Sequence, residues 1–150
     1  MRIRRATCFL AVSFAIAPLS ACDDPLRPRD VAGTYVLRSV RGEQPPAVLG
    51  AAGNGQLIVL ADTLRLNADG TGSEIWLLQY TGRYAAESGR LEVPILFEIH
   101  DGRLEGAYLC PVDRFCLPVA PPLRGHFTRV GLVLAVARHG EGPFDFRRID

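Results

Sequence analysis

The segment Leu91–Ile99 alternates large apolar side chains with mostly polar ones. In an extended strand, one face carries Leu91, Val93, Ile95, Phe97 and Ile99, and the other carries Glu92, Pro94, Leu96, Glu98 and His100. A period of two residues predicts a strand that is buried on one face and wet on the other. Pro94 lies in the outer set and has no N–H group, so we expect an edge position or a bulge there.

Short apolar runs punctuated by Gly, Asp, Asn and Pro continue along the chain, and we predict a strand in each of them. Besides Leu91–Ile99, these are Gly33–Val40, Gln56–Leu66, Thr71–Tyr80, Gly82–Ala86, Arg103–Leu109, Gly125–Arg129, Leu132–Arg138 and Phe144–Ile149. Gln56–Leu66 is long enough to be bulged, and Asp62 marks the irregularity. A short buried helix is the alternative over Val130–Ala137, but the enrichment in Val and Leu favours a strand.

Tight turns are expected to join these strands in sequence order, because Asp-Gly and similar pairs supply the positive φ that such turns require. The predicted turns are Asn67–Gly70, Ser88–Gly89 and Asp101–Gly102. A longer flexible loop is expected through Pro45 and Pro46 and across the glycine-rich run Gly50–Gly55. With about eight to ten strands, we expect an all-β fold, an antiparallel up-and-down barrel or a strongly curled meander, since closure removes exposed edges.

The first 21 residues have the layout of an export signal. Three arginines near the N-terminus precede the apolar stretch Ala6–Leu19, which is too short to span a membrane comfortably as a helix. An uncleaved anchor helix is the less favoured alternative, because Pro18 would disturb the end of the helix.

Removal of residues 1–21 would leave 129 of the 150 residues, enough for one domain with its own core. The loss of three arginines would lower the formal charge from +1 to −2. Such a chain has no basic face to offer, so we do not expect nucleic acid as a partner.

The run Leu19-Ser20-Ala21-Cys22 resembles the lipobox of bacterial lipoproteins. The resemblance implies cleavage before Cys22 and several acyl chains on Cys22, enough for stable membrane anchoring. Residues 22–31, rich in proline and charge, are then expected to form a tether, and residues 32–150 a single β domain. The implied location is the cell envelope, with the domain facing the periplasm or the cell exterior. Asp23 resembles an inner-membrane retention signal of enteric bacteria. That sorting rule does not extend to every bacterium, so the choice of membrane stays open.

Two further cysteines, Cys110 and Cys116, are separated by five residues. In an oxidising compartment outside the cytoplasm such a pair is most often a disulfide. Redox motifs keep their cysteines closer together, and a zinc site would need more ligands nearby. We therefore predict a structural disulfide between Cys110 and Cys116.

A second resemblance, to small lipocalin-like lipoproteins of bacteria, extends over residues 33–149. It is carried by Gly33–Leu37 and Val40, Pro45-Pro46, Leu64–Thr71, Gly82–Tyr84 and Phe144–Arg148. Lipocalins have a Gly-x-Trp sequence on the first strand and an arginine on the last strand that packs across the indole ring. Here Tyr35 takes the place of the tryptophan, and Arg147 or Arg148 that of the arginine. The resemblance implies a small antiparallel barrel and does not by itself imply a ligand.

Residue patterns for catalysis and metal binding are missing from the sequence. The histidines His100, His126 and His139 show no metal-ligand spacing, and no serine lies in a Gly-x-Ser-x-Gly motif. Glu92 and Glu98 share a strand face but lie roughly 20 Å apart along it, too far for an acid pair. The sequence therefore predicts no enzymatic activity, no metal and no cofactor.

Two functions fit a small barrel of this kind, depending on its interior. Tyr35, Leu37, Val93, Ile95 and Phe97 are expected to point inward, either closing on one another as a core or lining a ligand site. A filled core predicts a structural or interaction domain that contacts another envelope protein. An open interior predicts a lipocalin-like binding module for a small apolar ligand, with Gly50–Gly55 and the Cys110–Cys116 loop at its mouth. The filled core is the favoured interpretation.

Overall fold

The computed structural model describes residues 26–82, 87–109, 121–137 and 140–150 of the chain. Within these ranges the protein is nearly all β. Its elements are α1 (Pro28–Val31), β1 (Gly33–Val40), β2 (Ala47–Ala52), β3 (Gly55–Leu66), β4 (Thr71–Thr81), β5 (Glu87–His100), β6 (Arg103–Tyr108), β7 (Leu123–Phe127), β8 (Gly131–Ala137) and β9 (Gly140–Arg148). In this part of the chain no helix has the length and hydrophobicity needed to cross a membrane.

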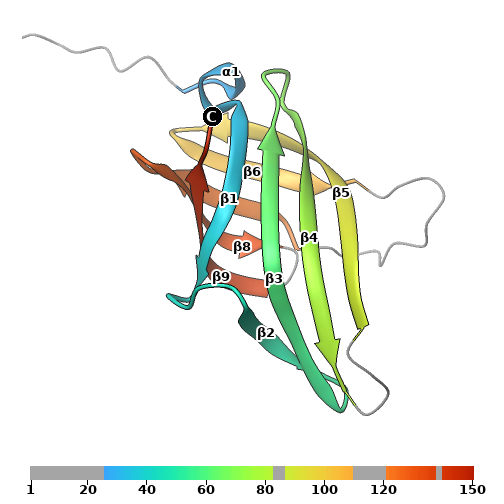
Figure 1. The fold of residues 1–150 in the computed structure, drawn as a ribbon. Coiled ribbons are helices and arrows are strands. Elements are labelled where there is room, and N and C mark those ends of the chain that lie inside the picture. The colour runs from blue at the N-terminus through green and yellow to red at the C-terminus, as the bar shows by residue number, and fades with distance from the viewer. Residues whose placement is uncertain (1–25, 83–86, 110–120, 138–139) are drawn as a thin grey trace, which may run out of the picture.

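The strands form one antiparallel sheet that closes on itself (Figure 1). Strands β3 to β9 follow one another in sequence order, and β1 pairs with both β9 and β3, which completes a barrel of eight strands. The predicted up-and-down barrel is therefore confirmed. Figure 1 shows α1 and the C-terminus at one end of the barrel and β2 at the other.

Strand β2 is an addition that the sequence did not predict, since this segment was expected to belong to a loop. Gly33–Val36 of β1 pair with one half of β3, and Ala47–Ala52 of β2 pair with the other half, Gly55–Val59. A segment with three alanines and one glycine, residues of low strand propensity, is thus held in a strand by the ladder that the long β3 offers. The turn between β2 and β3 contains Gly53, whose φ of 58° favours glycine.

The clearest predicted strand is confirmed as part of β5, with the expected orientation. Val93, Ile95 and Phe97 are buried, whereas Glu92 and Glu98 are exposed. At Pro94 the ladder with β6 ends, because pairing begins at Ile95, while the ladder with β4 continues without a bulge. Pro94 therefore lies where β5 lacks a paired β6 residue, and a missing N–H is tolerated there.

Two predicted turns are confirmed and one is wrong. Asp101 and Gly102 have φ values of 50° and 72°, as a tight two-residue hairpin turn requires. Asn67–Gly70 join β3 to β4. Ser88 and Gly89 are not a turn but part of β5, where Ser88 pairs with Gln79 of β4. Gly82 is a bend, and the rest of the predicted strand Gly82–Ala86 lies outside the described residues, as does Arg138 beyond the end of β8.

The irregularity in β3 lies earlier than predicted. The register with β4 shifts between Val59 and Ala61 and not at Asp62. Val59 precedes the bulge, and Asp62 and Leu64 follow it. The extra residue allows all three side chains to face the interior. The regular alternation of Asp62, Leu64 and Leu66 places a carboxyl group inside the barrel.

Apolar side chains fill the interior. The buried core cluster comprises Val31, Tyr35, Leu37, Val40, Ala47, Leu49, Val59, Leu64, Leu66, Ile95, Phe97, Leu104, Leu123, Leu132, Leu134, Ala137, Phe144 and Phe146. Strands β1, β3 and β5 to β9 all contribute to it. Val130–Ala137, for which a helix was the alternative, instead supplies core residues from strand β8.

Candidate functional site

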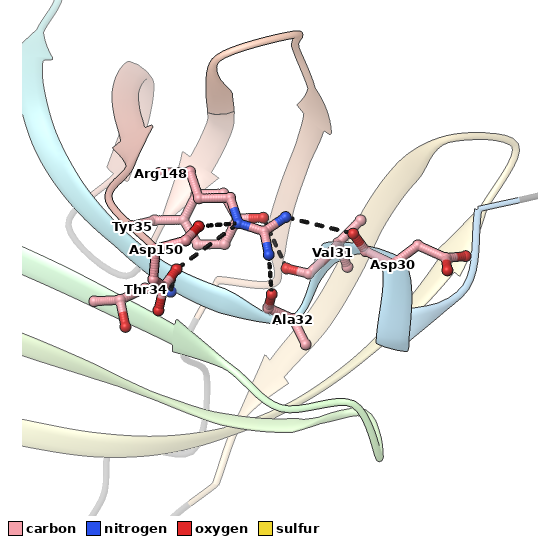
Figure 2. Close-up of polar contacts among 7 residues, drawn as sticks. All are labelled: Asp30, Val31, Ala32, Thr34, Tyr35, Arg148 and Asp150. Atoms are coloured by element: carbon pink, nitrogen blue, oxygen red, sulfur yellow. Dashed lines mark hydrogen bonds and ion pairs between the residues drawn. The ribbon is translucent and has the colours of Figure 1, made fainter.

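A network of hydrogen bonds holds α1 against one end of the barrel (Figure 2). The hydroxyl of Tyr35 donates to the carbonyl oxygen of Val31 at 2.7 Å. The guanidinium of Arg148, on the last strand, donates to the carbonyl oxygens of Ala32 at 2.6 Å and Asp30 at 3.5 Å. Val31 itself is 4% exposed and belongs to the core cluster. Side chains from the first and last strands thus fix α1, which lies within the range expected to be tether, to the barrel.

Arg148 lies nearer to Tyr35 than the other predicted arginine does. Tyr35 pairs directly with Arg148, whereas Arg147 pairs with Val36 and points to the outer face. Burial raises the pKa of Tyr35, and the nearby Arg148 partly opposes this rise. The carboxylate of Asp150 accepts a hydrogen bond from the Thr34 N–H at 2.7 Å, and this bond lowers the pKa of Asp150.

A groove of about 550 Å³ opens at this end of the barrel, between α1 and the turn that joins β7 to β8. Its lining includes Val31, Phe127, Val130, Arg147, Arg148 and Ile149. Apolar and cationic groups therefore meet on one surface, next to the point where the N-terminal segment enters the fold.

A second notable feature is a pair of carboxyl groups inside the barrel. Asp62 on β3 is 4% exposed and Glu74 on β4 is fully buried. Asp62 pairs with Trp76 and Glu74 pairs with Leu64, so the two acids are diagonal neighbours on the inner face. Burial, and then the neighbouring Glu74, raise the pKa of Asp62 well above its usual value.

Side chains around the acid pair include aromatic groups with polar atoms. The side chain of Trp76 beside Asp62 opposes the rise in the pKa of Asp62. The ring of Trp76 lies 6.0 Å from that of Tyr108, centre to centre. Trp76 is fully buried yet lies outside the core cluster. The arrangement retains a proton on Asp62 at pH values where an exposed aspartate has lost it.

Sequence reasoning missed this pair, although a signal was available. The turn Asn67–Gly70 sets Leu66 opposite Gly72, and counting back along both strands places Asp62 and Glu74 on the same face. Each acid taken alone, within a run of mixed polarity, gives no such indication.

The predicted inward residues Tyr35, Leu37, Ile95 and Phe97 lie together in the core cluster. Val93 is also buried, at 2% exposure, but lies opposite Glu74 and outside that cluster. The predicted lipidation site Cys22 and the predicted disulfide cysteines Cys110 and Cys116 lie outside the described residues, so those predictions stand as they were made.

Glu92 and Glu98, on the outer face, each contact a neighbouring side chain of β5. Glu98 and His100 approach to 2.9 Å, and Glu92 and Arg90 to 3.2 Å, all with largely exposed side chains. His126 is exposed, and His139 lies outside the described residues. Where the structure places side chains, no three metal-binding groups gather into a site.

Comparison with protein-family models, with curated proteins and with solved structures gives no match for this chain.

Proposed function

We propose that this chain is a non-enzymatic cell-envelope protein, held at a membrane by lipid on Cys22. Its barrel acts as a solid interaction domain that presents its outer surface and loops to another envelope component. The resemblance of Leu19–Cys22 to a lipobox supports the anchor, and the packing of the barrel supports the role of its surface.

The observation that carries the second part is the complete burial of apolar side chains from several strands of the described barrel. Leu64, Leu104, Leu123, Leu132 and Leu134 each have 0% exposure, although they come from β3, β6, β7 and β8. A side chain that lines a water-filled cup retains accessible area, because water reaches it from the cavity. Apolar side chains that touch across the barrel leave no volume for a ligand of fatty-acid size.

The anchor is tested by the fate of Cys22. We expect the mature wild-type protein to begin at Cys22 with acyl chains attached, and Cys22→Ala to abolish acylation and stop maturation, because the thiol accepts the lipid. Mass spectrometry of protein isolated from the membrane fraction measures both results. An intact N-terminal Met1, or an unmodified Cys22 on the mature wild-type chain, would show that the anchor is wrong.

The filled interior is tested with a fluorescent fatty acid added to the purified wild-type protein. We expect no saturable binding at micromolar concentrations of the probe, because the core side chains leave no cavity for it. The measurement is a fluorescence titration, with the protein denatured in urea as the control for non-specific signal. Saturable micromolar binding to the folded protein would favour the lipocalin-like binding module instead.

A further inference from the structure

We propose that the α1 end of the barrel lies against the phospholipid bilayer, with Leu26, Val130 and Ile149 in contact with lipid and Arg129 and Arg147 facing anionic headgroups. This inference rests on the proposed lipid anchor at Cys22 and adds to it a defined orientation of the domain.

The length of chain between the lipid and the fold is the first argument. Only Asp23, Asp24 and Pro25 separate Cys22 from Leu26, the first described residue. Even a fully extended chain of that length spans at most about 14 Å from Cys22 to Leu26. Acyl chains hold Cys22 at the membrane surface, so Leu26 cannot lie far from that surface in any conformation of the tether.

The attachment of α1 is the second argument, because it transmits this restraint to the whole barrel. Arg27 N–H donates to Asp30 at 2.9 Å and closes the first turn of α1. The side chains of Tyr35 and Arg148 then donate to the backbone carbonyl oxygens of Val31 and Ala32 (Figure 2). No flexible stretch of the described chain therefore separates Leu26 from the barrel, and the end that carries α1 must face the membrane.

The chemistry of this end is the third argument. Among the described residues, Val130 and Ile149 are the most exposed large apolar side chains, at 66% and 62%, and Leu26 is 40% exposed. Val130 and Ile149 also line the groove beside α1. Exposed apolar groups gathered on one surface of a soluble domain indicate a contact with lipid or protein. Here the short tether selects lipid.

Charge at this end favours an anionic surface. Arg129 and Arg147 line the same groove, and neither forms an ion pair with another described residue. Two acids, Asp30 and Asp150, line the groove as well, but Arg148 is a third arginine there, so the lining keeps an excess of positive charge. Two arginines beside apolar side chains fit the headgroup region of a bilayer that contains anionic lipid.

The experiment uses a tryptophan placed at the surface as a reporter of lipid contact. Trp76 is the single native tryptophan and is fully buried, so it contributes a constant background. Val130→Trp and the matched control Val48→Trp are made in the full chain and purified from membranes. Val48 is 42% exposed and lies on β2, at the opposite end of the barrel (Figure 1). Each protein is reconstituted into vesicles of phosphatidylcholine and phosphatidylglycerol, with or without brominated acyl chains.

We expect the Val130→Trp reporter to shift to shorter wavelength in vesicles and to lose most of its added emission to the brominated lipid. The Val48→Trp reporter is expected to be unaffected. Adding Arg129→Glu and Arg147→Glu to the first variant should reduce its quenching while the protein still floats with the vesicles.

Three results would overturn the inference. If Val130→Trp is not quenched although the protein floats with the vesicles, the anchor is right and the orientation is wrong. Equal quenching of Val48→Trp would mean that no particular end faces the lipid. A blue shift of Val130→Trp that is already present in detergent, without quenching in vesicles, would mean that another protein copy covers this end. Failure to float, together with an unmodified Cys22 by mass spectrometry, would instead reject the proposed anchor itself.

Discussion

Phe97→Ala is expected to lower the free energy of unfolding by about 3–5 kcal/mol, the range for truncation of a buried phenylalanine. Phe97 is 3% exposed and packs in the core cluster with Ile95 and residues of the facing strands. Removal of the ring leaves a cavity that a closed barrel cannot easily collapse, because ladders on both sides hold β5 in place. The loss is a large part of the total stability of a typical domain, about 5–15 kcal/mol.

The matched control is Leu96→Ala, on the same strand but on the outer face, where Leu96 is 46% exposed. Its effect is expected to stay within about 0.5 kcal/mol. Urea unfolding followed by circular dichroism measures both variants. If Phe97→Ala costs no more than Leu96→Ala, the ring does not fill the barrel, and the case for a solid interior fails.

The stability of the folded protein is expected to fall as pH rises above the pKa of an unfolded aspartate, about 3.9. Burial and the neighbouring Glu74 raise the pKa of Asp62 in the folded state. Between the unfolded and folded pKa values the folded protein therefore binds more protons than the unfolded chain. Over that window Asp62 alone lowers the free energy of unfolding by up to about 1.4 kcal/mol per pH unit. Its stabilising contribution is complete below the unfolded pKa and is lost once the pH exceeds the folded pKa.

Asp62→Asn removes this titration and is expected to flatten the dependence of stability on pH. Urea unfolding at a series of pH values compares it with wild type and with Glu98→Gln, a control at a carboxylate whose side chain is 78% exposed. The control should keep the slope of the wild type. A wild-type slope that persists in Asp62→Asn would mean that another group carries the proton.

The barrel was predictable because each strand bears its own pattern. Gly33–Val40 was predicted with the bounds of β1, and the alternation of Leu91–Ile99 gave the inner face of β5. Asp101 and Gly102 are residue types that accept the positive φ of a tight hairpin turn, so the turn could be predicted from these two residues alone. These features depend on residues within a few positions of one another, which is the range over which a single sequence is informative.

Features that depend on pairing between strands were not predictable from one strand at a time. Ala47–Ala52 forms β2 only because β3 is long enough to pair with it as well as with β1. Which of the two arginines lies beside Tyr35 depends on the register between β1 and β9, and a shift of one residue would exchange Arg148 for Arg147. Asp62 and Glu74 share one face because of the hairpin register between β3 and β4, which only counting across both strands reveals.

The pairing partners of β1 also bear on the order in which the protein can fold. The ladders from β3 to β9 join strands that are neighbours in sequence, and the entropy cost of forming each hairpin is correspondingly small. The ladder between β1 and β9 instead joins Tyr35 to Arg148, almost the two ends of the domain. Contacts of such large sequence separation form late. During synthesis β1 is made first and its partner β9 last. The barrel therefore stays open, with one edge of β1 unpaired, until β9 is available.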